Sequence, residues 1–197
     1  MVEGDVGAGA GATVGKLAGI GRAMKAGIGS ASFEVPSGLV VGALAAVNGF
    51  GDIIDPETGH VIAGVRTADG KGLADARTLI RAGATAGGFG AGANTTLVVV
   101  ATNAKLTKTE ATKVAQMAHD GLARALSPVH TPYDGDVVFA LATGTLNQAP
   151  DGPADLLTIG ALAADAAARA IVRAATQSSG LPGLPSVRTL GAPASGP

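Results

Sequence analysis

The residues of this chain that are best placed for chemistry lie at the junction of Asn94 and Thr95, where a glycine-rich segment meets a predicted strand. Glycine imposes no Cβ restriction, whereas the Thr and Val residues that follow favour extended backbone, so the sequence predicts a sharp bend directly before a buried strand. At such a bend the Thr95 hydroxyl can attack the carbonyl of Asn94, and hydrolysis of the ester frees a new N-terminal threonine. The alternative is an ordinary turn into a core strand.

A freed Thr95 would carry its own base. An α-amine titrates near ~7.7–8.0, so at neutral pH it can accept the proton of the hydroxyl on the same residue without a histidine partner. The junction therefore predicts self-cleavage between Asn94 and Thr95, followed by nucleophilic catalysis by Thr95.

Two carboxylates, Asp134 and Asp136, precede a second predicted strand that begins at Val137. Side chains two positions apart on extended backbone point to the same side, and Gly135 between them lets the backbone approach another element. One carboxylate could hold the Thr95 ammonium, while the other could orient the hydroxyl or bind a substrate amine. A Ca²⁺ or Mg²⁺ site and a loop of two solvated aspartates are the alternatives. Because only two hard ligands are evident, we expect no metal and no other cofactor.

These two segments, Asn94-Thr95-Thr96-Leu-Val-Val-Val and Asp134-Gly135-Asp136-Val-Val-Phe, together resemble the self-processing aminopeptidases of the L-aminopeptidase/D-esterase and β-aminopeptidase type. The resemblance is greatest to the branch that hydrolyses 6-aminohexanoate (nylon) oligomers, and it extends from about Val6 to about Ala175. It implies an α/β (α+β) chain with a four-layer αββα sandwich. It also implies an N-terminal-threonine amidohydrolase that cleaves small peptides or ω-amino-acid oligomers through an acyl-enzyme.

The chain departs from the aminopeptidase pattern at its nucleophile and its acidic pair. That branch carries a serine nucleophile and a Ser-x-Glu pair where this chain has Thr95 and Asp134-x-Asp136. The departure favours ω-amino-acid oligomers or other unusual amides over ordinary peptides. A self-processing acyltransferase of the ornithine acetyltransferase type and an inactive oligomerisation module are the alternative functions.

Lys16 closes a glycine-rich stretch that begins at Gly7. A phosphate-binding P-loop requires Gly-x-x-x-x-Gly-Lys-[Ser/Thr], but Ala10 stands at the first glycine position and Leu17 at the hydroxyl position, so nucleotide binding is disfavoured. The resemblance instead implies that this loop presents Lys16 to the active centre, where an ammonium could stabilise an oxyanion. A solvated surface lysine is the alternative.

Asn48 ends an apolar predicted strand, 39–47, which forms a hairpin with a strand over 25–35. The resemblance places this asparagine beside the nucleophile, as a donor to the developing oxyanion. Its alternative is an Asn-Gly turn, since asparagine tolerates left-handed backbone and bonds to its own main chain.

The remaining pattern predicts two helices and two irregular segments. Thr107 and Glu110 form a capping box for a one-sided helix that ends before Pro128, with His119 at the surface. A second helix, 155–175, is apolar almost all round and pairs Asp165 with Arg169 at i,i+4. We expect an extended linker over 51–94, with a short strand at most over 60–65 and some helical character over 73–82, and a flexible Gly/Pro/Ser tail over 177–197.

Composition bounds the protein further. With 197 residues, one domain is expected, over 1–176, made of 1–94 and 95–176 after self-cleavage. A net charge of −1 and 3% aromatic residues disfavour nucleic acid, and the absence of cysteine excludes disulfides and thiolate nucleophiles. No signal peptide or ~20-residue apolar span is evident, so we expect a cytoplasmic protein without membrane contact.

The resemblance also implies a segment upstream of Met1 that supplies further strands of the sandwich. We therefore expect a truncated sandwich with an uncovered apolar face that drives association into a homo-oligomer.

Overall fold

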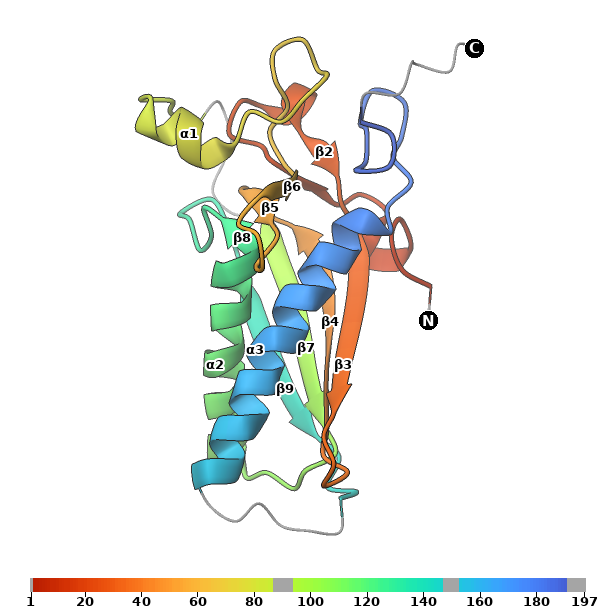
Figure 1. Ribbon diagram of the computed structural model, residues 1–197, viewed down its shortest axis with the longest axis vertical. Coiled ribbons are helices and arrows are strands. Elements are labelled where there is room, and N and C mark those ends of the chain that lie inside the picture. The colour runs from red at the N-terminus through yellow and green to blue at the C-terminus, as the bar shows by residue number, and fades with distance from the viewer. Residues whose placement is uncertain (1, 87–93, 147–152, 191–197) are drawn as a thin grey trace.

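A four-stranded mixed sheet organises the computed structural model, which describes residues 2–86, 94–146 and 153–190 (Figure 1). Its strands lie in the order β3-β4-β7-β9. β3 pairs with β4 and β4 with β7 in antiparallel fashion, whereas β9 runs parallel to β7. The strands are β3 (Ile28–Glu34), β4 (Val40–Asn48), β7 (Thr95–Thr102) and β9 (Val137–Ala142). The hairpin and the two strands predicted after Asn94 and Asp136 are thus confirmed.

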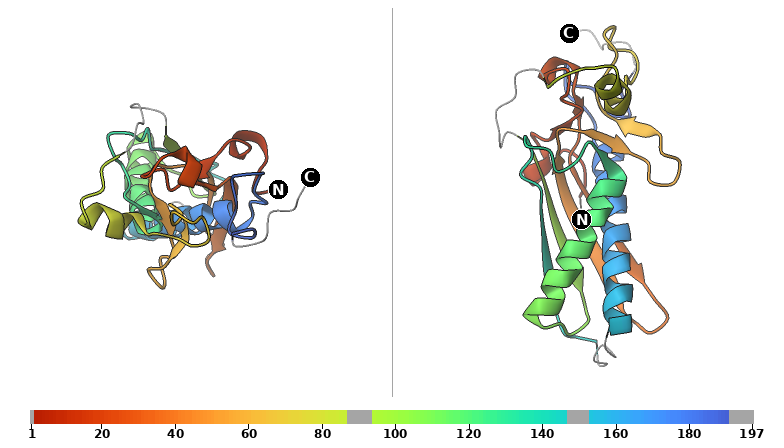
Figure 2. Two further views of the ribbon diagram at one scale, coloured as in Figure 1. Left: turned by 90° about the horizontal axis from the view of Figure 1, so that it is seen from above. Right: turned by 90° about the vertical axis from the view of Figure 1, so that its left-hand side faces the viewer.

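Two helices, α2 (Lys108–Ala125) and α3 (Pro153–Thr176), cover one face of this sheet (Figures 1 and 2). The predicted capping box opens α2, because the Thr107 side chain accepts from the Glu110 backbone and Glu110 bonds back to Thr107. Small side chains allow close packing: a Cβ on Gly121 of α2 would lie 2.2 Å from the carbonyl oxygen of Ala164 in α3.

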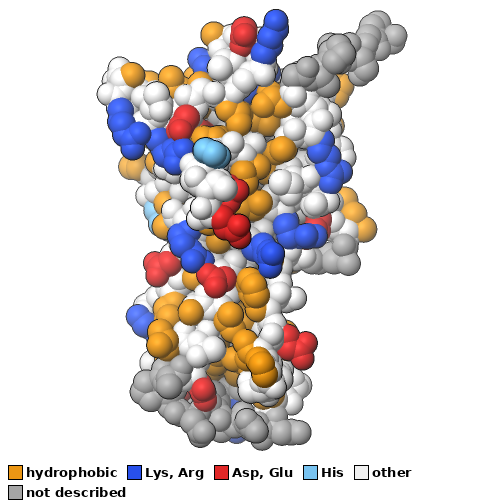
Figure 3. All heavy atoms as spheres, in the orientation of Figure 1, with side chains coloured by type: hydrophobic (Ala, Val, Ile, Leu, Met, Phe, Trp, Pro, Cys, Tyr) orange, Lys and Arg blue, Asp and Glu red, His pale blue; other side chains and the backbone are white. Residues whose placement is uncertain are grey.

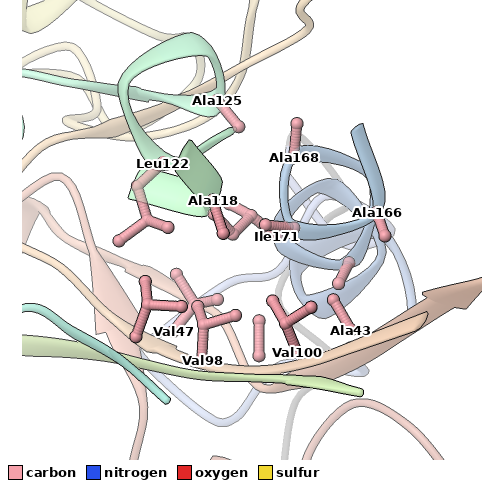
Figure 4. Close-up of a cluster of buried hydrophobic side chains, with 14 of the residues drawn as sticks. Ala43, Val47, Val98, Val100, Ala118, Leu122, Ala125, Ala166, Ala168 and Ile171 are labelled. Carbon is pink, nitrogen blue, oxygen red and sulfur yellow. The ribbon is translucent and has the colours of Figure 1, made fainter. Parts of the chain in front are cut away.

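The core between sheet and helices consists mainly of Ala, Val, Leu and Ile, as the composition predicts. Figure 4 shows Val47, Val98 and Val100 of the sheet pointing towards Leu122 of α2 and Ile171 of α3. All five side chains are buried.

The charged residues of α3 differ from the prediction. Asp165 forms its ion pair with Arg124 of α2 at 2.6 Å, and Arg169 lies over the ring of Phe33 at 5.7 Å. The i,i+4 pairing is wrong because neighbouring elements offer partners that an isolated helix lacks. Figure 3, seen from the helix side, shows side chains of both charge signs interspersed over this face.

The opposite face of the sheet is apolar and open. Burial alternates along β7 and β9, so that one set of side chains faces the helices and the other faces away. Leu97, Val99, Phe139 and Leu141 face away and are 36–60% exposed. Figure 2 shows that both helices lie on the other side of the sheet. Among the described residues, the four-stranded sheet is thus covered by helices on one face, and the mixed α/β class is confirmed.

Short elements gather at the end of the sheet where β4 finishes and β7 begins (Figure 1). They comprise two small sheets, one short helix and two 3₁₀ turns. Their bounds are β1 (Thr13–Val14), β2 (Met24–Lys25), β5 (Asp52–Ile54), β6 (Val61–Ala63), β8 (Leu126–Ser127), α1 (Ala76–Arg81), η1 (Gly7–Gly9) and η2 (Ile20–Arg22).

The segment predicted as an extended linker contains the short strand and the helix indicated by its sequence, β6 and α1, but it is folded over most of its length. β5 pairs with both β6 and β8, and the fully buried Asp52 accepts hydrogen bonds from the backbone of Val65 (2.8 Å) and Ala76 (2.7 Å). Burial raises the pKa of Asp52 to about 6. A polar sequence can be compact when one buried carboxylate satisfies several backbone donors. Positions 87–93 of the predicted linker lie outside the described residues.

The expected flexible tail is also wrong for residues 177–190. Ser178 and Ser186 are fully buried, and the backbone N–H of Lys25 donates to the carbonyl of Pro185 at 2.8 Å. Ser178 Oγ donates to Asp5, so this segment packs on the N-terminal region. Its composition resembles a linker, but its backbone groups find partners in distant parts of the chain. Residues 191–197 lie outside the described part.

Among the helices of the described residues, none combines the length and the apolar character needed to span a membrane.

Candidate active site

Sheet register brings the Asn94-Thr95 junction together with Asn48 and Asp134. Thr95 is the first residue of β7 and lies opposite Asn48, the last residue of β4. Asn94 forms a parallel bridge with Asp134, just before β9. β4 thus ends, and β7 and β9 begin, at the same end of the sheet, where β7 has an antiparallel neighbour in β4 and a parallel neighbour in β9.

The carbonyl group of Asn94 carries two hydrogen bonds. Its oxygen accepts from the backbone N–H of Gly135 at 2.9 Å and from the Thr95 hydroxyl at 2.5 Å. Asn94 is 1% exposed. A Cβ on Gly135 would lie 3.1 Å from Thr95 Oγ1, so glycine allows this close approach. The N–H donor polarises the carbonyl, and the hydroxyl is held against the peptide group that it would attack.

Lys16 lies in the same cluster, buried below the junction. Its ammonium donates to the carbonyl oxygen of Asn48 (2.9 Å), to Asn48 Oδ1 (2.8 Å) and to Asn94 Oδ1 (2.8 Å). These three acceptors match the three donors of an ammonium group. Burial lowers the pKa of Lys16 to about 8, an effect opposed by the charge of Asp134. The glycine-rich loop therefore presents Lys16 to the junction.

The side-chain oxygen of Asn48 accepts hydrogen bonds at the junction. Its Oδ1 receives hydrogen bonds from Lys16 and from the backbone N–H of Thr13, at 3.1 Å. The Asn94 amide is fixed at both ends, since its Nδ2 donates to the carbonyl of Tyr133 at 3.2 Å. Lys16 thus links the two asparagines on either side of Thr95.

Asp134 and Asp136 hold different segments. Asp134 accepts from the backbone N–H of Phe50 at 2.9 Å and from the Thr131 hydroxyl at 2.5 Å. Asp136, whose side chain is 3% exposed, accepts from the backbone N–H of Thr96 at 2.7 Å. Each carboxylate is directed at N–H and O–H donors, which argues against the Ca²⁺ or Mg²⁺ alternative. Asp134 thus binds the segment after β4, and Asp136 binds the start of β7 next to the junction.

An open hollow of about 390 Å³ lies beside the junction. The hollow is lined by two histidines, His119 and His130, and by Thr131, Asp134, Gly135 and Asp136.

The structure thus brings together all the residues predicted for the site, Lys16, Asn48, Asn94, Thr95, Asp134 and Asp136. Reasoning from sequence missed the main-chain donors, above all the N–H of Gly135 on the Asn94 carbonyl. Its only sequence signal was a glycine between two aspartates, which indicates a close approach but not its target.

A family model for Peptidase family S58 matches residues 1–187. The chain belongs to this peptidase family. Among the S58 relatives, an uncharacterized aminopeptidase of Mycobacterium bovis is 37% identical over 181 residues, which cover 85% of this chain and 53% of that protein. The chain therefore spans about half the length of this relative.

Two further similar proteins bear on the branch and the fold. A 6-aminohexanoate-oligomer endohydrolase of Kocuria sp. is 33% identical over 54 residues, 27% of this chain and 15% of that protein. The likeness to the nylon-oligomer branch therefore rests on a shorter stretch than the likeness to the mycobacterial aminopeptidase. The L-aminopeptidase D-Ala-esterase/amidase of Ochrobactrum anthropi, described as a variant of the Ntn hydrolase fold, superposes with a TM-score of 0.61 at 20% identity, over 90% of this chain and 46% of that one. The chain shares this fold.

Proposed function

We propose that the chain is a self-processing N-terminal-threonine amidohydrolase of the aminopeptidase type, which cuts itself between Asn94 and Thr95. One observation carries this proposal: the Thr95 hydroxyl and the Gly135 N–H both bond to the carbonyl of Asn94. Membership of a peptidase family and the similarity to an aminopeptidase support the amide-cleaving activity.

Maturation would proceed by an N-to-O acyl shift. Thr95 Oγ1 attacks the carbonyl carbon of Asn94, and the negative charge that develops on the oxygen is stabilised by the Gly135 N–H. The C–N bond breaks, the nitrogen takes up the hydroxyl proton and becomes the α-amine of Thr95, and an ester joins Asn94 to Oγ1. Water then hydrolyses the ester. The products are a carboxylate on Asn94 and a threonine with free amine and free hydroxyl.

The freed Thr95 would then act on external amides. Its amine accepts the hydroxyl proton, Oγ1 bonds to the substrate carbonyl carbon, and the leaving amine departs with that proton. Water hydrolyses the acyl-enzyme. In this proposal Lys16 and Asn48 stabilise the oxyanion, while Asp134 and Asp136 position the backbone around the nucleophile and its amine.

Adjacent threonines provide a matched test of the nucleophile. Thr95→Val removes the attacking hydroxyl but keeps the side-chain shape, whereas Thr96→Val makes the same change at a residue whose hydroxyl is buried and points away from the junction. Intact mass spectrometry should find two chains, 1–94 and 95–197, in wild type and Thr96→Val, and one uncut chain in Thr95→Val. Normal cleavage of Thr95→Val would refute autocatalysis.

The substrate class is part of the proposal. Small peptides are supported by the mycobacterial relative, and 6-aminohexanoate-like oligomers by the shorter match to the Kocuria endohydrolase. Acyl transfer to an amine is the competing activity. Incubating a cleaved substrate with added amine distinguishes the two, because hydrolysis yields only free acid whereas a transferase yields the new amide.

We further propose that the protein is a homo-oligomer associated through the open apolar face of the sheet. An exposed surface containing Phe139 and Leu141 loses unfavourable contact with water when covered. Light scattering should show a smaller assembly for Phe139→Ser, with Leu157→Ser as the control, since Leu157 is exposed on α3 instead. An unchanged assembly in Phe139→Ser would contradict this interface. The cytoplasmic location remains a prediction.

A further inference from the structure

One histidine makes two contacts to the buried carboxylate of Asp136. His130 lies in the loop between β8 and β9, and both its backbone N–H (3.2 Å) and its ring Nδ1 (2.9 Å) reach Asp136 Oδ2. An ionised carboxylate only accepts hydrogen bonds, so Nδ1 is the donor. His130 has a φ of 53°, a left-handed conformation that is uncommon outside glycine and costs free energy. In this conformation both N–H donors of His130 reach the same oxygen of Asp136.

Asp136 also bonds to β7, the strand that begins with Thr95. Its other oxygen, Oδ1, accepts from the backbone N–H of Thr96 at 2.7 Å, the residue next to Thr95. The imidazole of His130 is therefore connected to the first residues of β7 through a single carboxylate. Because His130 holds one carboxylate oxygen, the other oxygen of Asp136 keeps its orientation towards the Thr96 N–H.

A second imidazole, that of His119, lies next to the ring of His130. His130 Nε2 lies 3.3 Å from Nδ1 of His119, which projects from α2. When His130 is neutral its Nε2 accepts, so His119 must carry its proton on Nδ1. When His130 is protonated its Nε2 donates, and His119 must be neutral and accept. The hydrogen bond between the two rings can therefore form only when at most one of them is protonated.

The pair is also open to water and has an acidic neighbourhood. His130 is 39% exposed and both rings line the hollow beside the junction, so they can exchange protons with solvent. The charged groups that face them are Asp120 of α2 and Asp136, with Asp134 on the same hollow. Burial and the charge of His130 lower the pKa of His119, whereas the two former carboxylates raise it.

We propose that His130 is a positioning residue for the Thr95 centre, holding Asp136 in place, and that protonation of the hydrogen-bonded pair of His119 and His130 alters this contact. This inference rests on the proposed function. When the pair is protonated, the cation beside Asp136 draws the negative charge of the carboxylate away from the Thr96 N–H. Protonation of the pair therefore slows cleavage at Thr95.

The test uses the full chain and two substitutions that tolerate left-handed backbone. His130→Gly removes the ring, while His130→Asn keeps a side-chain N–H near the position of Nδ1 but does not titrate. We expect His130→Gly to slow cleavage by up to roughly 100-fold, the loss that follows misplacement of a reacting group by about 1 Å. His130→Asn should restore most of the rate and lack the slowing in acid that we expect of wild type. His60→Ala, at an exposed histidine that does not line the hollow beside the junction, is the control and should match wild type.

A second readout does not depend on activity. In the uncut Thr95→Val chain, NMR titration of the histidine ring protons should show a higher pKa for His119 after His130→Asn, because the neighbouring charge is gone. Failure of wild type to cut would refute the proposed function. A wild type that cuts, with His130→Gly cutting at the same rate or with His119 titrating independently of His130, would refute this inference alone.

Discussion

Substituting Gly135 by alanine should slow self-cleavage although it removes no functional group. The added Cβ would lie 3.1 Å from Thr95 Oγ1 and 3.7 Å from the Asn94 carbonyl oxygen, so the hydroxyl has to move by a few tenths of an ångström. The donor N–H of residue 135 is retained. Because a misplacement of about 1 Å can cost ~100-fold, we expect a loss of roughly 3- to 10-fold in the cleavage rate.

The assay is the time course of the two product masses after the chain is refolded. Gly21→Ala is the matched control, since a Cβ on Gly21 meets no atom within 4 Å. If the two variants have equal melting temperatures, a difference between their cleavage rates arises at the junction and not from a loss of stability. If Gly135→Ala cleaves as fast as Gly21→Ala, the hydroxyl does not attack from the position described, and the proposed geometry is wrong.

Three other changes test the surroundings of the site and the fold. Since burial lowers the pKa of Lys16 to about 8, cleavage should slow as pH rises through about 8, and Lys16→Met should be roughly 10²-fold slower without this limb, measured by the same mass assay. Hydrogen bonds from Arg173, opposed in part by burial, lower the pKa of Glu3 to about 2. This carboxylate therefore stabilises the fold above its unfolded pKa of 4.5 and loses that effect as pH falls through about 2. Glu3→Gln should reduce the free energy of unfolding by roughly 1–2 kcal/mol at pH 7, as measured by denaturant titration, and by less in acid. Thr96→Val should raise that free energy by up to roughly 1 kcal/mol in the same titration, because Thr96 Oγ1 is buried without a hydrogen-bond partner among the described residues.

Patterns along the chain located the elements that depend on local preference. The hairpin before Asn48, the strand after Thr95 and the capping box at Thr107 follow from β-branched runs, turn residues and spacing, which act over a few residues. The approach of Lys16 to Asn94, 78 residues away, was expected only through resemblance, because local preference does not encode how a loop docks on a sheet.

The errors have a common physical origin in long-range polar contacts. Asp52 folds the segment around β5 and β6 by accepting two distant backbone donors, and Ser178 anchors the C-terminal segment on Asp5. His130 was not predicted to take part in the site because its role depends on one left-handed φ angle and on Asp136 facing it. None of these contacts produces a periodic pattern of residues from which it could be predicted.

The contact between Lys16 and the Asn94 side chain has a consequence for the timing of activity. In the uncut chain every N–H of the ammonium already has an oxygen acceptor, and one of these acceptors belongs to the residue on the acyl side of the bond to be cut. After the cut, the new carboxylate of Asn94 would remain next to Gly135 and the lysine, occupying the place that an incoming acyl group needs. Release of the new C-terminus at Asn94, rather than cleavage itself, would then open the enzyme to substrate, and a lag between the appearance of the two masses and the onset of turnover would be its kinetic signature.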